Sequence, residues 1–364
     1  MTPLALALAL AAAGPGVRTT LPPAPVQLYR VAWRRPFVPP TALEYRAEER
    51  GGVAVDPATR LAVFGTRDGW LHAVRPDGSV AWEFQGAGPF GQPRVDGDTV
   101  YVGSTDGRLY AVALPTGKER WHYQTDEDLT TRPAVSHGLV FVASQQDTLF
   151  ALEAATGAWK WHHRAEAKGA GGFTIFGAAS AIVGDDTVYV SHSDGLAAAI
   201  DAKAGAAIWK KQLSRTGDHL DVDGLAIDAG RLYAASYSGS VIAVNARTGD
   251  VVWTAAAPGA SRVGVAEGLV VAVTTSTIEA FSISDGSKIW SVPMRGGPEG
   301  DPVAAGRWML VPTGDQGLLW IETASGRILR VFDPGTGVSA SPALLGRRVY
   351  VLSNGGDLYA LDLS

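Results

Sequence analysis

Short stretches of alternating apolar and polar residues recur along the whole chain, and turn-forming residues separate them. Around residue 100, four such stretches follow one another, at 92–96, 99–103, 109–112 and 119–123. Asp106-Gly107 and Thr116-Gly117 lie between the later ones, and glycine there allows the positive φ that a tight hairpin requires. The pattern therefore predicts four consecutive antiparallel strands joined by hairpins.

This unit is repeated. Gly326 begins a copy with Arg330 in a position that elsewhere holds tryptophan, and neighbouring copies are 37 to 48 residues apart. That spacing fits one four-stranded sheet with its turns, and repeated sheets of this size stack around a ring. In the other six copies a glycine lies four residues before a tryptophan, at Gly78/Trp82, Gly117/Trp121, Gly157/Trp161, Gly205/Trp209, Gly249/Trp253 and Gly286/Trp290.

The two ends of the repeat region complement each other. The last copy contains only three predicted strands, at 340–344, 348–352 and 358–361. Residues 28–37 match a fourth strand, with Trp33 in the tryptophan position. We therefore predict an all-β fold, an eight-bladed β-propeller of four-stranded antiparallel blades whose last blade is closed by the N-terminal strand. Residues 28–364 are expected to form this single domain.

Tryptophans in the fourth strand are interpreted as structural. A large ring on the outermost strand fills the widening gap between two stacked sheets, and its burial is worth about 4 to 6 kcal/mol as an upper bound. The predicted structural set is Trp33, Trp82, Trp121, Trp161, Trp209, Trp253 and Trp290.

The N-terminal residues predict export. Residues 4–13 form an apolar run of signal-peptide length that is too short to span a bilayer, so residues 1–13 are interpreted as a signal peptide. Residues 14–27 contain four prolines and are interpreted as an extended linker. We expect a periplasmic protein without a transmembrane helix in the mature chain, and leave association with the outer membrane open.

Composition narrows the possible functions. Hydrophobic residues make up 46% of the 364 residues, which is enough for a large core and excludes disorder. The formal net charge is −5 and no long basic run is present, which argues against nucleic acid as a partner. The chain has no cysteine, which excludes disulfides, thiolate metal sites, cysteine nucleophiles and lipid attachment to cysteine.

The repeat unit at residues 107–121 resembles the PQQ-like β-propeller repeat, and the resemblance extends over residues 28–362. Within that superfamily, residues 220–224 and 231–253 are similar to the BamB family of the outer-membrane β-barrel assembly machinery. The resemblance implies a non-catalytic protein-binding scaffold of the bacterial cell envelope, monomeric and without a cofactor, whose partner is a BamA-like envelope protein or another periplasmic protein. It also implies that Asp221 and Asp223 lie beside the partner-binding surface.

One loop departs from the family pattern. The family places an arginine-containing loop one blade earlier, where this chain has Phe173, Ile175, Phe176 and Gly177, with Phe176 in place of the arginine. The two longest repeat spacings put extra residues near 165–176 and 212–220, in connections that emerge on one face. Because loops on a rigid scaffold commonly bind partners, we predict a contact surface there. The alternative is that the three apolar residues begin a buried strand.

Two other functions remain open. Quinoprotein dehydrogenases resemble this repeat, but they are longer and their insertions supply the quinone and calcium sites, which have no counterpart here. The seven histidines show no metal-binding spacing, and adjacent His162 and His163 on a strand point to opposite faces. Aspartates such as Asp68, Asp106 and Asp194 are interpreted as turn formers. We therefore predict no catalytic residue and no metal site. The third possibility is a propeller that binds a small ligand or glycan in its central channel.

Overall fold

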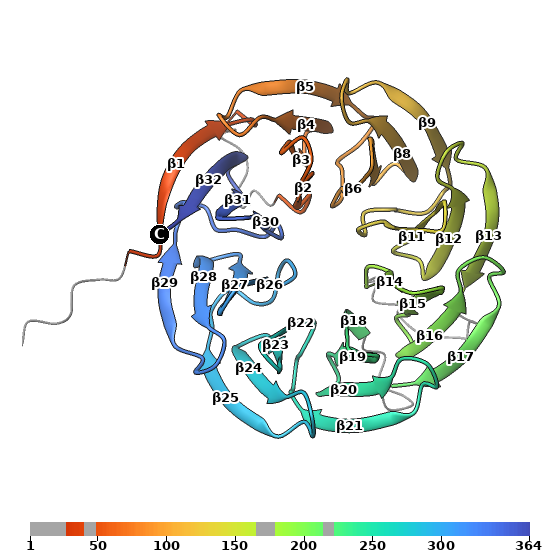
Figure 1. Ribbon diagram of the computed structural model, residues 1–364, viewed down its shortest axis with the longest axis vertical. Coiled ribbons are helices and arrows are strands. Elements are labelled where there is room, and N and C mark those ends of the chain that lie inside the picture. The colour runs from red at the N-terminus through yellow and green to blue at the C-terminus, as the bar shows by residue number, and fades with distance from the viewer. Residues whose placement is uncertain (1–26, 40–48, 165–178, 214–221) are drawn as a thin grey trace, which may run out of the picture.

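Eight four-stranded antiparallel sheets stand around a central axis like the blades of a propeller, as Figure 1 shows. The computed structural model describes residues 27–39, 49–164, 179–213 and 222–364, with the side chains of residues 222 and 223 left aside. These residues form 32 strands and no helix, so none of them builds an apolar helix long enough to cross a bilayer. The predicted eight-bladed β-propeller is confirmed.

The first four blades follow one another along the chain, and in each the first strand is innermost and the fourth is outermost. Blade 1 contains β2 (Val53–Val55), β3 (Ala62–Gly65), β4 (Trp70–Val74) and β5 (Val80–Gln85). Blade 2 contains β6 (Arg94–Asp96), β7 (Thr99–Gly103), β8 (Arg108–Ala113) and β9 (Glu119–Gln124). Blade 3 contains β10 (Ala134–Ser136), β11 (Leu139–Ala143), β12 (Thr148–Glu153) and β13 (Trp159–Arg164). Blade 4 contains β14 (Ile182–Gly184), β15 (Thr187–Ser191), β16 (Leu196–Asp201) and β17 (Ala207–Gln212).

The other four blades complete the ring. Blade 5 contains β18 (Val222–Asp228), β19 (Arg231–Ser236), β20 (Ser240–Asn245) and β21 (Val251–Ala256). Blade 6 contains β22 (Arg262–Ala266), β23 (Leu269–Val273), β24 (Thr277–Ser282) and β25 (Lys288–Pro293). Blade 7 contains β26 (Val303–Ala305), β27 (Trp308–Thr313), β28 (Gly317–Glu322) and β29 (Ile328–Phe332). Blade 8 contains β30 (Ala343–Leu345), β31 (Arg348–Leu352), β32 (Asp357–Leu363) and β1 (Tyr29–Pro36).

Blade 8 is closed by the N-terminal strand. β1 pairs antiparallel with β32, from Tyr29 opposite Leu363 to Pro36 opposite Asp357. The backbone N–H of Ser364 donates to the carbonyl of Leu28 at 2.9 Å, so the two ends of the described chain meet in one sheet. β1 thereby covers the outer edge of β32, which would otherwise be unpaired, as the sequence predicts.

The outer-strand tryptophans connect each blade to the next one. Each indole N–H donates to a backbone carbonyl in the turn between the third and fourth strands of the following blade, at 2.6 to 3.2 Å. The ring also covers the glycine of that turn, whose φ lies between 69° and 85°, and a Cβ added there would lie 2.5 to 3.1 Å from the indole. The donors are Trp33, Trp82, Trp121, Trp161, Trp209, Trp253 and Trp290, and the glycines they cover are Gly78, Gly117, Gly157, Gly205, Gly249, Gly286 and Gly326 respectively.

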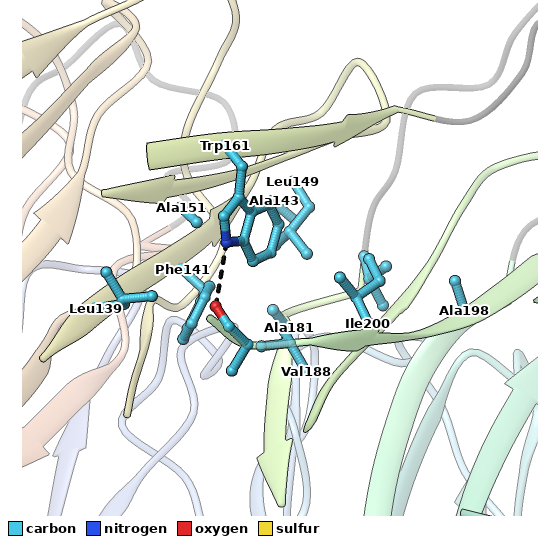
Figure 2. Packing of buried hydrophobic residues seen from close by; sticks show 12 residues of the cluster. Leu139, Phe141, Ala143, Leu149, Ala151, Trp161, Ala181, Val188, Ala198 and Ile200 are labelled. Atoms are coloured by element: carbon cyan, nitrogen blue, oxygen red, sulfur yellow. Dashed lines mark hydrogen bonds between the residues drawn. The ribbon is translucent and has the colours of Figure 1, made fainter. Parts of the chain in front are cut away.

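Figure 2 shows one such interface. Trp161 of blade 3 lies over apolar side chains of its own blade and of blade 4, among them Phe141 and Val188, and its indole is 9% exposed. Its N–H donates to the carbonyl of Ala202 at 3.1 Å. The core of the protein is therefore a series of similar apolar layers, one between each pair of blades.

Blade 7 differs from the other blades. In those seven blades the tryptophan of the outer strand pairs with an alanine of the third strand, whereas exposed Arg330 pairs with Trp320. Trp320 is fully buried, and Tyr29 of β1 stacks on it with a centroid distance of 5.1 Å. In blade 8 the turn that an indole would cover is replaced by the meeting of β32 and β1. In blade 7 the large aromatic ring is therefore that of Trp320, which lies on β28, the strand next to β29.

Candidate functional site

One face of the propeller carries the connections between blades together with the turns between second and third strands. We call it the connection face. Around blade 4, the strands that precede two of these connections end at Arg164 and Gln212, and the strands that follow begin at Ile182 and Val222. The predicted contact residues Phe173, Ile175, Phe176, Gly177 and Asp221 lie in these connections, outside the described residues. The prediction that they form a contact surface therefore remains open.

Asp223 lies at the connection-face end of β18, the innermost strand of blade 5. Val222 pairs with Ser236 and Gly224 pairs with Ala235, so Asp223 occupies a bulge in the ladder. A bulge interrupts the regular alternation of side chains along a strand. The regular alternation of side chains along a strand therefore does not determine whether the side chains of Asp221 and Asp223 lie on the same side of β18.

The turns of blades 3 and 4 are joined on the same face by Asp147. Its carboxylate accepts a hydrogen bond from the backbone N–H of Ser193 at 2.8 Å and a further one from the Ser193 hydroxyl. Asp147 has a φ of 64° in a turn position that Gly107 and Gly195 occupy in the neighbouring blades. Burial raises the pKa of the Asp147 carboxyl. A strained, non-glycine residue that bonds across blades is a feature that turn chemistry alone does not predict.

His192 begins the same turn of blade 4 and replaces a hydroxyl residue. The other seven blades have serine or threonine there, for example Ser144 and Ser236. His192 is 1% exposed, and its ring lies 5.4 Å from the ring of His163. Burial lowers the pKa of His192 to about 4, so the imidazole is neutral at pH 7.

The aspartates interpreted as turn formers have that geometry. The Asp194 carboxylate accepts from the backbone N–H of Leu196 at 2.9 Å, and Asp106 accepts from the N–H of Arg108 at 3.3 Å. The Asp68 carboxylate accepts from the Thr66 hydroxyl at 2.6 Å. Across the described ranges, no three histidine or acidic side chains gather in a group that could hold a metal ion.

A cavity of about 300 Å³ opens on the central axis at the connection face. The opening lies inside the innermost strands, which frame the centre of Figure 1. Nearly every lining residue is polar. The lining comprises Arg50, Gln92, Thr130, Thr131, Arg132, Gln145, Ser180, Arg262, Glu299, Gly300, Asp301, Ser339 and Ser341.

Strand register shows that six of the lining residues occupy equivalent positions in their blades. In every blade, one residue of the innermost strand pairs with a residue near the middle of the second strand. The equivalent position is the residue that comes two places earlier in the sequence. The sequence pattern does not reveal these positions, because they share no residue type and lie outside the apolar repeat. In blade order the eight positions are Gly52, Gln92, Arg132, Ser180, Gly224, Arg262, Asp301 and Ser341, and all of them except Gly52 and Gly224 line the cavity.

Four-stranded blades that dock through a tryptophan and a turn glycine, and close through an N-terminal strand, define an eight-bladed β-propeller of PQQ-like repeats. A family model described as "Outer membrane protein assembly factor BamB" matches residues 30–129, 67–292 and 274–364. The chain belongs to this family.

Individual proteins agree with that assignment. The outer membrane protein assembly factor BamB of Shewanella oneidensis is 25% identical over 357 residues, which span 91% of this chain and 77% of that protein. The crystal structure of BamB from Moraxella catarrhalis has a TM-score of 0.77 at 22% identity, covering 92% of this chain and 98% of that one. The quinohemoprotein alcohol dehydrogenase from Comamonas testosteroni has a TM-score of 0.72 at 17% identity, covering 92% of this chain and 76% of that one. Both structural likenesses show the fold alone.

Proposed function

We propose that this protein is a non-catalytic scaffold of the bacterial cell envelope that takes part in the assembly of outer-membrane proteins. The observation that carries this proposal is the family match, which runs from residue 30 to residue 364. The outer membrane protein assembly factor BamB of Shewanella oneidensis aligns with 91% of the chain. A rigid ring that carries long connections on one face suits a protein that binds others.

We further propose a periplasmic, monomeric protein without a cofactor whose partner is a BamA-like envelope protein. Residues 1–13 would be the signal peptide, residues 14–27 the linker, and residues 28–364 the binding domain. The apolar run at 4–13 and the prolines that follow support this layout.

The proposed contact surface consists of Asp221 and Asp223 together with the loop from Phe173 to Gly177. Its support is topological, since the strands on both sides of these segments end on the connection face around blades 3, 4 and 5. Phe176 provides apolar area where the family has an arginine. Binding by the two aspartates would rely on basic groups of the partner and would weaken with salt.

The double variant Asp221→Ala/Asp223→Ala tests the surface. We expect it to remain folded, because carboxylates that serve a partner-binding surface contribute little to stability, and to lose binding of the periplasmic region of BamA in a pull-down. The matched control is Asp228→Ala/Asp250→Ala, which removes two exposed acidic residues from the opposite face of the same blade. Retention of wild-type binding by the first variant, with an unchanged circular dichroism spectrum, would remove this surface from the proposal.

The non-catalytic character is tested separately. Purified protein is incubated with pyrroloquinoline quinone and calcium, and dye-linked alcohol oxidation is measured. We expect no turnover above the protein-free reaction. Oxidation that depends on the protein would replace the scaffold proposal with the enzymatic one.

A further inference from the structure

The mouth of the central channel contains an arginine whose guanidinium forms no ion pair with any residue that the structure describes. Arg132 of blade 3 lines the cavity, and only its backbone N–H is engaged, donating to the Ser180 hydroxyl at 3.1 Å. Among the described residues, no carboxylate forms an ion pair with its guanidinium. Burial and the nearby Arg94 lower the pKa of Arg132, while Asp301 acts in the opposite direction. A partly buried cation without a counter-ion is costly, which indicates a place prepared for an anion.

The groups around Arg132 are held in place by the backbone. Arg262 donates from Nε to the Glu299 carbonyl at 2.7 Å and from a terminal nitrogen to the Ser261 carbonyl at 3.0 Å. Its Nε also lies 3.8 Å from the Asp301 carboxylate. The backbone N–H of Asp301 donates to the Ser341 hydroxyl at 2.8 Å. Cross-blade bonds therefore preorganise these lining residues, which reduces the cost of ordering them around a ligand.

The net charge of the side chains that line the cavity restricts the charge of a ligand that can bind there. Arg50, Arg132 and Arg262 contribute three positive charges, and Glu299 and Asp301 contribute two negative ones, so the formal sum is +1. One negative charge balances this sum. A dianion such as hydrogen phosphate would leave an excess that the two acidic side chains repel.

The side chains that line the cavity also restrict which chemical class of ligand can bind there. Threonine, serine and glutamine side chains supply hydrogen-bond donors and acceptors around the cavity, and no aromatic ring is among the described lining residues. Such a surface suits hydroxyl groups and offers no stacking platform for a flat quinone. The volume of about 300 Å³ admits a molecule of the size of a monosaccharide.

We propose that the channel mouth binds a small hydroxylated monocarboxylate, such as a uronic acid, with the carboxylate on Arg132. The guanidinium fork matches the two carboxylate oxygens, and the hydroxyl and amide side chains of the lining bond the ligand hydroxyls. The Asp301 carboxylate, in blade 7, accepts from a ligand hydroxyl across the channel. This site is separate from the proposed protein-binding surface.

Calorimetric titration with sodium D-glucuronate tests the proposal. Wild-type protein is expected to show saturable binding below about 10 mM glucuronate. D-Glucose, which lacks the carboxylate, and sodium phosphate are each expected to bind about tenfold more weakly or not at all. Absence of saturable glucuronate binding, or equal binding of phosphate or glucose, would overturn the proposal.

Two variants assign the carboxylate contact. Arg132→Gln is expected to weaken glucuronate binding by about tenfold or more, whereas Arg132→Lys keeps the charge without the planar fork and weakens it less. Arg330→Gln, which changes an exposed arginine on the outer strand of blade 7, is expected to bind as the wild type does. Equal binding by Arg132→Gln and the wild type would exclude Arg132 as the carboxylate ligand.

Folding and the proposed partner serve as independent readouts. Arg132→Gln removes a cation that has no ion pair within the described part of the chain, so we expect no fall in the thermal midpoint of this variant. It is also expected to retain BamA binding in the pull-down. If Arg132→Gln loses its folded spectrum, the Arg132→Lys titration decides the assignment: weakened glucuronate binding by folded Arg132→Lys supports the ligand role, and wild-type binding by that variant overturns the role of the planar fork.

Discussion

Tryptophan docking determines how single residues stabilise this ring. In the sequence, the four-residue spacing relates a glycine and a tryptophan of the same blade, for example Gly157 and Trp161. The contact itself joins different blades, because Trp161 covers Gly205 of blade 4 and Gly157 lies under Trp121 of blade 2. The spacing is regular because each blade must present a glycine to the preceding blade and an indole to the following one.

The first prediction compares the same register position in two blades. Trp161→Ala removes a ring that is 9% exposed and should cost about 3 to 5 kcal/mol of unfolding free energy. Arg330→Ala removes an exposed side chain at the equivalent position and should change stability by less than about 0.5 kcal/mol. Urea denaturation measures both, and similar losses in the two variants would contradict a blade-docking role for Trp161.

The second prediction concerns His192 and pH. Because burial depresses its pKa to about 4, the unfolded chain takes up a proton below pH 6.5 that the folded protein does not. Stability through this residue is therefore fully present above pH 6.5 and falls by about 1.4 kcal/mol per pH unit until pH 4. His192→Ser restores the residue type of the repeat and removes the titration.

The measurement is the difference in unfolding free energy between wild type and His192→Ser from pH 7.5 to pH 4.5. Groups that lie far from the His192 ring titrate alike in the two proteins and cancel in this difference. We expect the wild type to lose stability relative to the variant as the pH falls. A constant difference would show that His192 is protonated in the folded state as readily as in the unfolded one.

At the scale of elements, β1 is the strand on which ring closure depends. It contributes the outer edge of blade 8 and places Trp33 against blade 1, where the indole N–H donates to the Pro76 carbonyl at 2.8 Å. Deletion of residues 1–37 removes this strand and exposes β32, so we expect aggregation or loss of the cooperative thermal transition. Deletion of residues 1–26 keeps every described strand and should melt as the full chain does. Equal melting of the two truncations would refute closure by β1.

The sequence predicted these elements well where a residue type repeats. The turn glycine recurs in seven copies and the tryptophan follows it in six of them, and the strand expected at 28–37 is found at Tyr29–Pro36. Prediction failed at equivalent positions that hold different residue types in different blades. Arg330 was recognised as an exception, but its buried counterpart Trp320 lies on another strand, and only the pairing of β28 with β29 relates the two. The equivalent positions that line the channel were missed for the same reason.

At the scale of the whole molecule, closure makes the eight interfaces members of one cooperative ring. An open stack of repeats has two ends, and an end repeat unfolds more easily than an internal one because it has one neighbour instead of two. In the closed ring every blade has two neighbours, including blades 8 and 1, where the chain enters and leaves. The interface made by Trp33 is then as internal as the one made by Trp161.

This leads to a comparison of Trp33→Ala with Trp161→Ala, which weaken interfaces on different sides of the ring. Each variant should show a single urea transition with an unchanged m-value and a lower midpoint. The loss should be smaller for Trp33, because its indole is only partly buried whereas that of Trp161 is 9% exposed. A separate transition at low urea in Trp33→Ala alone would mean that blade 8 opens independently and that the propeller behaves as an open stack.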